Sequence, residues 1–169
     1  MADYSKLAIY DINAYLWQKL QDANLFDERT YYVDELQDTL IPIIPAQQIP
    51  ELNNLLPGKS YIVYDYETKP TMENWWITEE IVTYSILSQS YDHINKIINF
   101  MSDTFRRYDD AAKDLRTYFA GNSEFEFHFS YIDKIISPEY FKSEGGFQMG
   151  IVDICVSYAR KLDSSGRFQ

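Results

Sequence analysis

The chain has 169 residues and a formal net charge of −11, so tight binding to the phosphate backbone of a nucleic acid is disfavoured. Its hydrophobic fraction of 46% is enough to build a core, and large rings are frequent, with 15 Tyr, 10 Phe and 3 Trp. Because such rings are enriched in the cores of protein interfaces, this composition favours a subunit of a larger assembly; the alternative is an ordinary Tyr-rich core and surface.

The first third of the chain predicts one helix and then an irregular stretch. Ser5 is placed to cap a helix that runs to about Ala23, and its apolar stripe consists of Ile9, Ile12, Leu16 and Leu20. Residues 25–58 are irregular and contain prolines. Within them, the run 40–50 is predicted to be an extended edge strand or a docked loop, because proline cannot occupy a central strand.

The middle of the chain predicts two strands followed by a long helix. Residues 61–66 are β-branched and aromatic, residues 67–74 form a polar loop, and residues 75–88 form a strand with apolar residues on both faces. A helix capped by Ser90 or Asp92 then extends to about residue 119. Its buried stripe consists of Ile94, Ile97, Ile98, Met101 and Phe105.

The last third predicts two more strands. Residues 124–133 alternate, with Phe125, Phe127, Phe129 and Tyr131 on one face. A long connection, 134–146, leads to a final strand over 147–160, and residues 161–169 form a flexible tail. The order of elements predicts a single α+β domain over residues 1–160. It contains a small, mostly antiparallel sheet packed by an N-terminal helix and one long amphipathic helix, with extended loops or arms.

Residue patterns that carry chemistry are weak in this sequence. His93 and His128 have no second His or Cys at metal-ligand spacing and are predicted to lie at the surface. Cys155 stands in an apolar run, which is typical of a small buried hydrophobe, and a single Cys excludes an internal disulfide. Neither a Gly-rich phosphate loop nor a nucleophile elbow occurs. We therefore expect no catalytic residue, no metal site and no cofactor, and hence not an enzyme.

No apolar stretch in the sequence approaches the length needed to cross a bilayer, so no membrane partner is expected. The first ten residues carry a single Lys and no apolar core, so no signal peptide is expected, and the chain is predicted to be soluble and made in the cytoplasm.

Four runs together resemble the phage tail-completion proteins, which are the tail terminators or head–tail joining neck subunits of tailed bacteriophages. The runs are W-x-I-T-E-E-I-V-T-Y-S-I-L-S, F-R-R-Y-D-D-A-A-K-D-L, F-x-F-x-F and G-G-F-x-x-G-I-V-D-I-x-V-x-Y. The resemblance covers about Tyr61 to Arg160 and the leading helix, and it is one of order and character. The proline-containing run 40–50 has no place in the family pattern.

The resemblance implies a small α/β subunit of a homo-hexameric ring that caps the tail tube, contacts neck and connector proteins, and lets DNA pass without specific binding. It also implies localisation in the neck or tail of the virion. In such a ring, we expect inter-subunit contacts at Arg106, Arg107, Asp109 and Asp110, where both charge signs stand together on the long helix. We expect the lumen to be lined by acidic residues on strands, namely Glu79, Glu80, Glu124 and Glu126.

The same acidic composition supports an alternative of another class. A monomeric or dimeric binding module, such as an inhibitor or immunity-type protein, would block a basic partner through charge complementarity. The mass of the protein in solution separates the two hypotheses.

Overall fold

The computed structural model describes residues 7–34, 37–48, 55–70, 77–105, 114, 123–139 and 146–161. The helical elements are α1 (Ala8–Asp22), the short 3-10 turn η1 (Ala46–Gln48) and α2 (Tyr91–Phe105). The strands, in chain order, are β1 (Tyr31–Val33), β2 (Asp38–Leu40), β3 (Ile43–Pro45), β4 (Tyr61–Pro70), β5 (Ile77–Ser88), β6 (Phe125–Glu139) and β7 (Gln148–Arg160).

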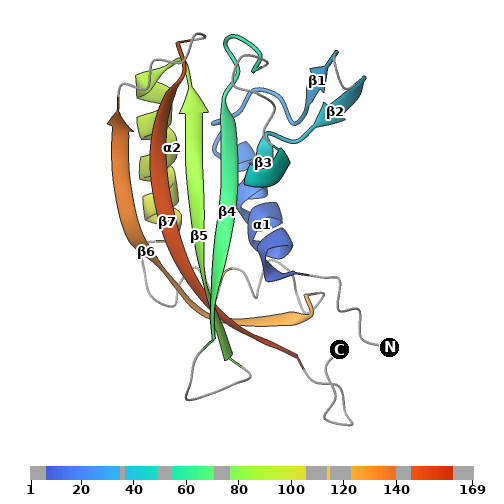
Figure 1. Ribbon diagram of the computed structural model, residues 1–169, viewed down its shortest axis with the longest axis vertical. Coiled ribbons are helices and arrows are strands. Elements are labelled where there is room, and N and C mark those ends of the chain that lie inside the picture. The colour runs from blue at the N-terminus through green and yellow to red at the C-terminus, as the bar shows by residue number, and fades with distance from the viewer. Residues whose placement is uncertain are drawn as a thin grey trace.

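Five strands form one twisted sheet in the order β3-β4-β5-β7-β6 (Figure 1). All neighbours are antiparallel except β3, which pairs parallel with β4 at one edge. β1 and β2 form a separate two-stranded antiparallel sheet. The predicted α+β class with a mostly antiparallel sheet is thereby confirmed.

Both helices lie against the same face of the five-stranded sheet (Figure 1). α2 packs closely over β7, since a Cβ built on Gly150 would lie 2.8 Å from side-chain carbons of both Ile94 and Ile98. α1 is joined to β5 by a hydrogen bond of 2.7 Å from the Tyr84 hydroxyl to Asn13 Oδ1. The two helices meet where the rings of Tyr15 and Phe105 pack edge to face at 6.1 Å.

The apolar stripes predicted from the sequence form the core. All five residues of the α2 stripe are buried, together with Phe125 and Phe127 of β6 and the predicted stripe of α1. This part of the prediction is confirmed. Tyr131 is an exception, because the register shift between Phe127 and Phe129 pairs it with Cys155 and so places it on the opposite face from Phe127. The side chain of Phe129 lies outside the described residues, as does Ser5, the predicted cap of the first helix. The expected extension of the second helix, from residue 106 to about 119, also lies outside them, except for Asp114. Ser90 caps α2 instead of Asp92, because its Oγ accepts a hydrogen bond of 3.3 Å from the His93 N–H.

Three stretches predicted to be irregular or loops are wrong in part. Residues 25–58 contain the short strands β1, β2 and β3 and the turn η1. β6 continues through residues 134–139, where the sequence suggested a connection, and β4 continues to Pro70, beyond its predicted end at Tyr66. The register of β6 against β7 shifts at three places, and such bulges let an irregular sequence remain paired at an edge. Pro138 lies within the last of these shifts, between Ile136 and Glu139, on an edge strand, where proline is tolerated. The proline-containing run at 40–50 contains edge strand β3, the first of the two predicted possibilities.

Candidate functional site

The four glutamates expected to share one surface do not lie together. Glu79 and Glu80 are neighbours on β5, so strand alternation points them to opposite faces of the sheet. Glu79 is partly exposed on the face away from the helices. Ala159 of β7 lies on that same face, because it pairs with Ile77 of β5. Glu126 of β6 pairs with Ala159, so this exposed residue shares the face of Glu79. Of the four glutamates, a common acidic surface could therefore include only Glu79 and Glu126.

The structure corrects the expectation that Glu80 lines the lumen. Its side chain is only 4% exposed, and it accepts a hydrogen bond from the Tyr158 hydroxyl of β7. Burial raises the pKa of this carboxyl above its ordinary value of 4.5, and hydrogen bonds from Tyr158 and Thr68 partly oppose the shift. The position on the helix-covered face therefore makes Glu80 an interior polar group.

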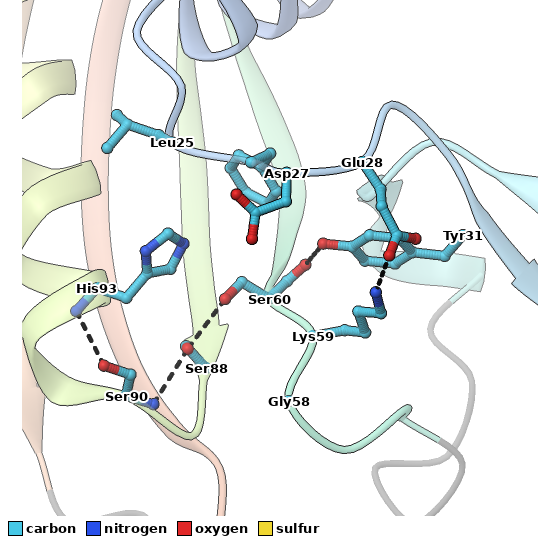
Figure 2. Close-up of a pocket in the computed structure, with 11 residues that line it drawn as sticks. Leu25, Asp27, Glu28, Tyr31, Gly58, Lys59, Ser60, Ser88, Ser90 and His93 are labelled. Carbon is cyan, nitrogen blue, oxygen red and sulfur yellow. Dashed lines mark hydrogen bonds and ion pairs between the residues drawn. The ribbon is translucent and has the colours of Figure 1, made fainter.

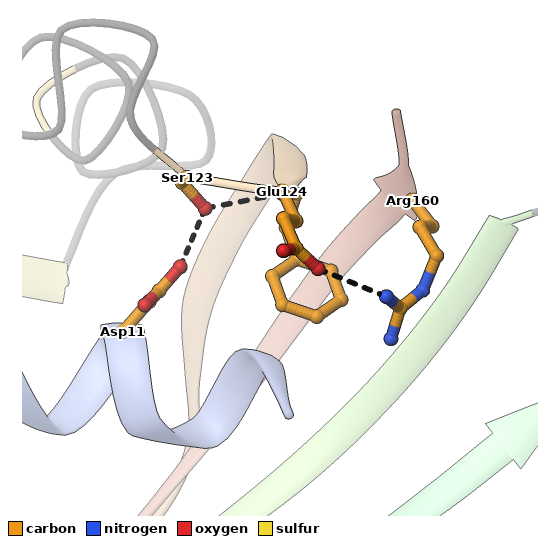
Figure 3. Close-up of polar contacts among 5 residues, drawn as sticks. Asp11, Ser123, Glu124 and Arg160 are labelled. Atoms are coloured by element: carbon orange, nitrogen blue, oxygen red, sulfur yellow. Dashed lines mark hydrogen bonds and ion pairs between the residues drawn. The ribbon is translucent and has the colours of Figure 1, made fainter. Parts of the chain in front are cut away.

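Glu124 is held in a polar cluster near the start of β6 (Figure 3). Its carboxylate forms an ion pair of 3.1 Å with the Arg160 guanidinium, and each of these side chains is less than one-fifth exposed. Arg160 also lies over the ring of Phe125, 4.9 Å from its centroid. Beside this pair, the Ser123 hydroxyl donates to the Asp11 carboxylate and accepts from the Phe125 N–H. The cluster ties α1 to the ends of β6 and β7.

The expected inter-subunit residues Arg106, Arg107, Asp109 and Asp110 lie outside the described residues. Nearby, the Asp114 carboxylate accepts a hydrogen bond of 2.6 Å from the Tyr15 hydroxyl and pairs with Lys19 at 2.9 Å. These contacts keep the pKa of Asp114 below its usual range, with the Tyr15 bond as the largest cause. This acidic residue therefore remains ionised beside α1.

A small polar pocket lies beside the start of β4 and the end of β5, at the opposite end of the sheet from the Glu124–Arg160 pair (Figure 2). It has a volume of about 270 Å³ and is lined by residues 25–28, Tyr31, residues 58–60, Ser88, Ser90 and His93. The Ser60 hydroxyl donates to Ser88 Oγ at 2.9 Å, and Ser88 Oγ also accepts from the Ser90 N–H at 3.1 Å. The Tyr31 hydroxyl donates to the Ser60 carbonyl at 2.9 Å. These hydroxyls thus join the start of β4 to the end of β5.

His93 lines this pocket and is partly buried, so the prediction that it lies at the surface is corrected. Its ring packs edge to face on Phe26 at 5.9 Å. Burial and the nearby Lys96 lower the pKa of His93, against the smaller opposite effects of Asp27 and Asp92, so the imidazole is neutral at pH 7. Lys59 at the rim forms an ion pair with Glu28. The pocket therefore offers one neutral base beside hydroxyls that are engaged in holding the sheet.

The face of the five-stranded sheet opposite α1 and α2, here called the outer face, has an unusual composition. Its side chains include Ile77, Ile81, Thr83 and Ser85 of β5 and Met149, Ile151 and Asp153 of β7, all partly exposed. A sheet with one solvated face ordinarily alternates apolar and polar residues. Here three isoleucines and a methionine are placed where polar residues are usual. The sequence signal for this face was the mixed character of both sides of residues 75–88.

No family model matches the chain, and a search of curated proteins also finds no match. Within the described ranges, no group of three or more His, Cys, Asp or Glu side chains is arranged to hold a metal ion. In that same part of the chain, no helix is long and apolar enough to cross a membrane.

Proposed function

We propose that this chain is a structural subunit of a ring in the neck or tail of a tailed bacteriophage, of the tail-terminator type. Such a ring would cap the tail tube, join it to the head connector and let DNA pass. The observation that carries the proposal is the apolar outer face of the sheet. It presents partly exposed isoleucines that a subunit contact would bury.

The size of the outer face fits this role. β5 and β7 pair along their whole described lengths, from Ile77 opposite Ala159 to Ser88 opposite Gln148. On this face Ile81 pairs with the buried Cys155, and Ile151 pairs with Ser85. The apolar side chains thus belong to one rigid surface, and a preorganised surface loses little conformational entropy on association. Rigid strands also fix the direction in which each subunit presents its contacts.

The charge of the chain supports the same proposal. At a net charge of −11, a ring of identical subunits has a strong negative field, which repels phosphates and so favours sliding of DNA over binding. Glu79 and Glu126 place two carboxylates on the outer face, beside the apolar side chains. A subunit contact at this face would take these two carboxylates away from the lumen, so the support from charge is the negative field of the ring as a whole.

The solution mass of the purified protein, followed by electron microscopy, tests the proposal. We expect particles of six times the 20.0 kDa chain, seen as rings, either alone or on addition of tail tubes. Ile81→Lys and Ile151→Lys should abolish the rings while the circular dichroism spectrum stays native. Tyr91→Lys is the matched control, since Tyr91 is 51% exposed on α2, away from the outer face. Rings that persist in both isoleucine variants would refute this use of the outer face.

The alternative proposal, an acidic module that blocks a basic partner, has the same charge as its support. It predicts a monomer or dimer at all concentrations and a stable one-to-one complex with a basic protein. A solution mass of one chain that does not change on addition of tail tubes would favour this alternative over the ring.

A further inference from the structure

One edge of the sheet continues beyond its partner strand. β3 pairs with only three residues of β4, from Ile62 to Tyr64, whereas β4 runs on to Pro70. Within the described ranges, no strand pairs with the outer side of β4 over residues 65–70. Residues 65–69 are all exposed, and an unpaired strand edge is a template for pairing with another chain.

The direction of the backbone groups along this edge follows from one hydrogen bond. The Ile62 N–H donates to the Pro42 carbonyl at 2.8 Å, which points Ile62 toward the β3 side. Alternation along the strand directs the N–H groups of Tyr66 and Thr68 to that same side. The Tyr66 N–H is hydrogen-bonded at 2.9 Å to the Asp65 carboxylate, a local contact in place of a ladder bond. An added strand would replace this local bond at Tyr66 and would use the Thr68 N–H, which points to the same side.

A hollow lies beside this edge, where β3 ends. It has a volume of about 710 Å³, and its lining consists of Tyr10, Pro45, Gln47, Tyr64, Asp65 and Tyr66. Tyr10 is 54% exposed and Tyr66 38% exposed, so their rings are open to a ligand. Tyr64 lines the same hollow. Burial is the main cause of the raised pKa of Tyr64, and Tyr10 and Tyr66 add to the shift.

We propose that this edge and this hollow bind an extended segment of a basic partner protein, which adds a strand beside Tyr66 and Thr68 and places an arginine side chain among the tyrosines. Strand addition gives affinity through main-chain hydrogen bonds, and a neighbouring pocket gives specificity. Arginine suits the hollow because its guanidinium stacks on aromatic rings and bonds to a carboxylate such as that of Asp65. This inference does not depend on the ring proposal.

The charge of the chain decides which partner the edge accepts. At a net charge of −11, a basic segment is attracted, and exposed Asp65 and Glu67 give that attraction a local origin at the edge itself. Lys69 and Pro70 lie at the far end of β4, and these residue types disfavour the pairing of one sheet edge with another. The proposed segment would pair beside Tyr66 and Thr68 and so would not need to pair with Lys69 and Pro70.

A peptide titration tests the inference on the full chain. The probe is a nine-residue peptide of alternating threonine and valine with one central arginine, compared with the same peptide carrying glutamate at its centre. We expect the arginine peptide to bind about tenfold or more tightly than the glutamate peptide, as measured by fluorescence anisotropy. In NMR spectra, binding should slow the hydrogen exchange of the Thr68 amide.

Variants separate the hollow from the edge. Tyr10→Ala and Tyr66→Ala should each weaken the arginine peptide by about three- to tenfold and leave the glutamate peptide unchanged. Tyr32→Ala is the control, because Tyr32 is similarly exposed at 52% but belongs to β1, in the other sheet. No binding of either peptide, equal binding of both, or binding without protection of the Thr68 amide would overturn the inference. So would protection of that amide in the free protein that grows with concentration, since a second copy would then occupy the edge.

Discussion

Replacing Gly150 by alanine tests how closely α2 seats on the sheet. The new Cβ would lie 2.8 Å from Ile94 Cγ2 and 2.8 Å from Ile98 Cδ1, whereas carbon atoms in favourable contact are about 3.5–4.0 Å apart. Two effects then oppose each other. Loss of glycine from a strand stabilises the folded state by about 0.5–1 kcal/mol. Overpacking of a tight core destabilises it by about 1–3 kcal/mol. The second effect is larger, and we expect a net loss of about 1–2 kcal/mol.

Urea denaturation measures this difference, and a double-mutant cycle identifies its cause. Ile98→Val removes the Cδ1 atom that the new Cβ would meet, and alone it should destabilise by about 0.5–1.5 kcal/mol. Combined with Gly150→Ala, it should have a smaller effect than the sum of the two single changes, because it relieves the contact. Ala159→Gly on the same strand is the control for the backbone effect and should destabilise by about 0.5–1 kcal/mol. A Gly150→Ala protein as stable as the unaltered one, or additive behaviour in the cycle, would refute the close seating of α2.

Three further changes address the core and its polar groups. Phe127→Ala removes a fully buried ring and should lower the free energy of unfolding by about 3–5 kcal/mol in urea denaturation; a change below about 1 kcal/mol would contradict its core position. Glu80→Gln should be at least as stable as the unaltered protein at pH 7.5 and show no such advantage at pH 4. Because the pKa of Glu80 is raised in the folded state, its contribution to folding stability is complete below pH 4.5 and is lost as pH rises through the folded-state pKa. A Glu80→Gln variant that is less stable than the unaltered protein at pH 7.5 would contradict this reasoning. Arg160→Gln removes the ion pair between Arg160 and the partly buried Glu124 carboxylate, and it should lower the stability by about 1–3 kcal/mol, measured as a lower melting temperature. Lys96→Gln, which removes an exposed pair with Asp92, should change the stability by less than about 0.5 kcal/mol.

The helices and the central strands were predictable because their periodicity is strong. The stripe from Ile94 to Phe105 and the alternation around Phe127 each place apolar residues on one face, and burial of that face is the main driving force. The extension of β6 to Glu139 was missed because the register shifts after Ile132 and after Ile136 break the two-residue period from which a strand is recognised. The parallel pairing of β3 with β4 depends on a contact between distant segments that no local pattern encodes.

The candidate site was less predictable than the fold. The expectation that Glu79 and Glu80 both line the lumen failed for Glu80. An acidic residue type does not reveal which face of the sheet the helices cover. The hollow beside Tyr66 combines α1, β3, η1 and β4, and only the packing of these elements brings Tyr10 to Tyr64. The sequence indicated this hollow only through the high frequency of tyrosine. That frequency indicates that the protein has a surface suited to contacts, but it does not indicate where the surface lies.

The placement of β7 between β5 and β6 has a consequence for how the protein is made. β5 finds its second neighbour only when the segment up to Arg160 has been synthesised, since Ile77 pairs with Ala159 across the intervening helix and strand. Until then, a nascent chain on the ribosome exposes one whole edge of β5 and the apolar side of α2. Pairings between such distant residues form slowly, so this interval is when the chain is most exposed to aggregation and to capture by chaperones.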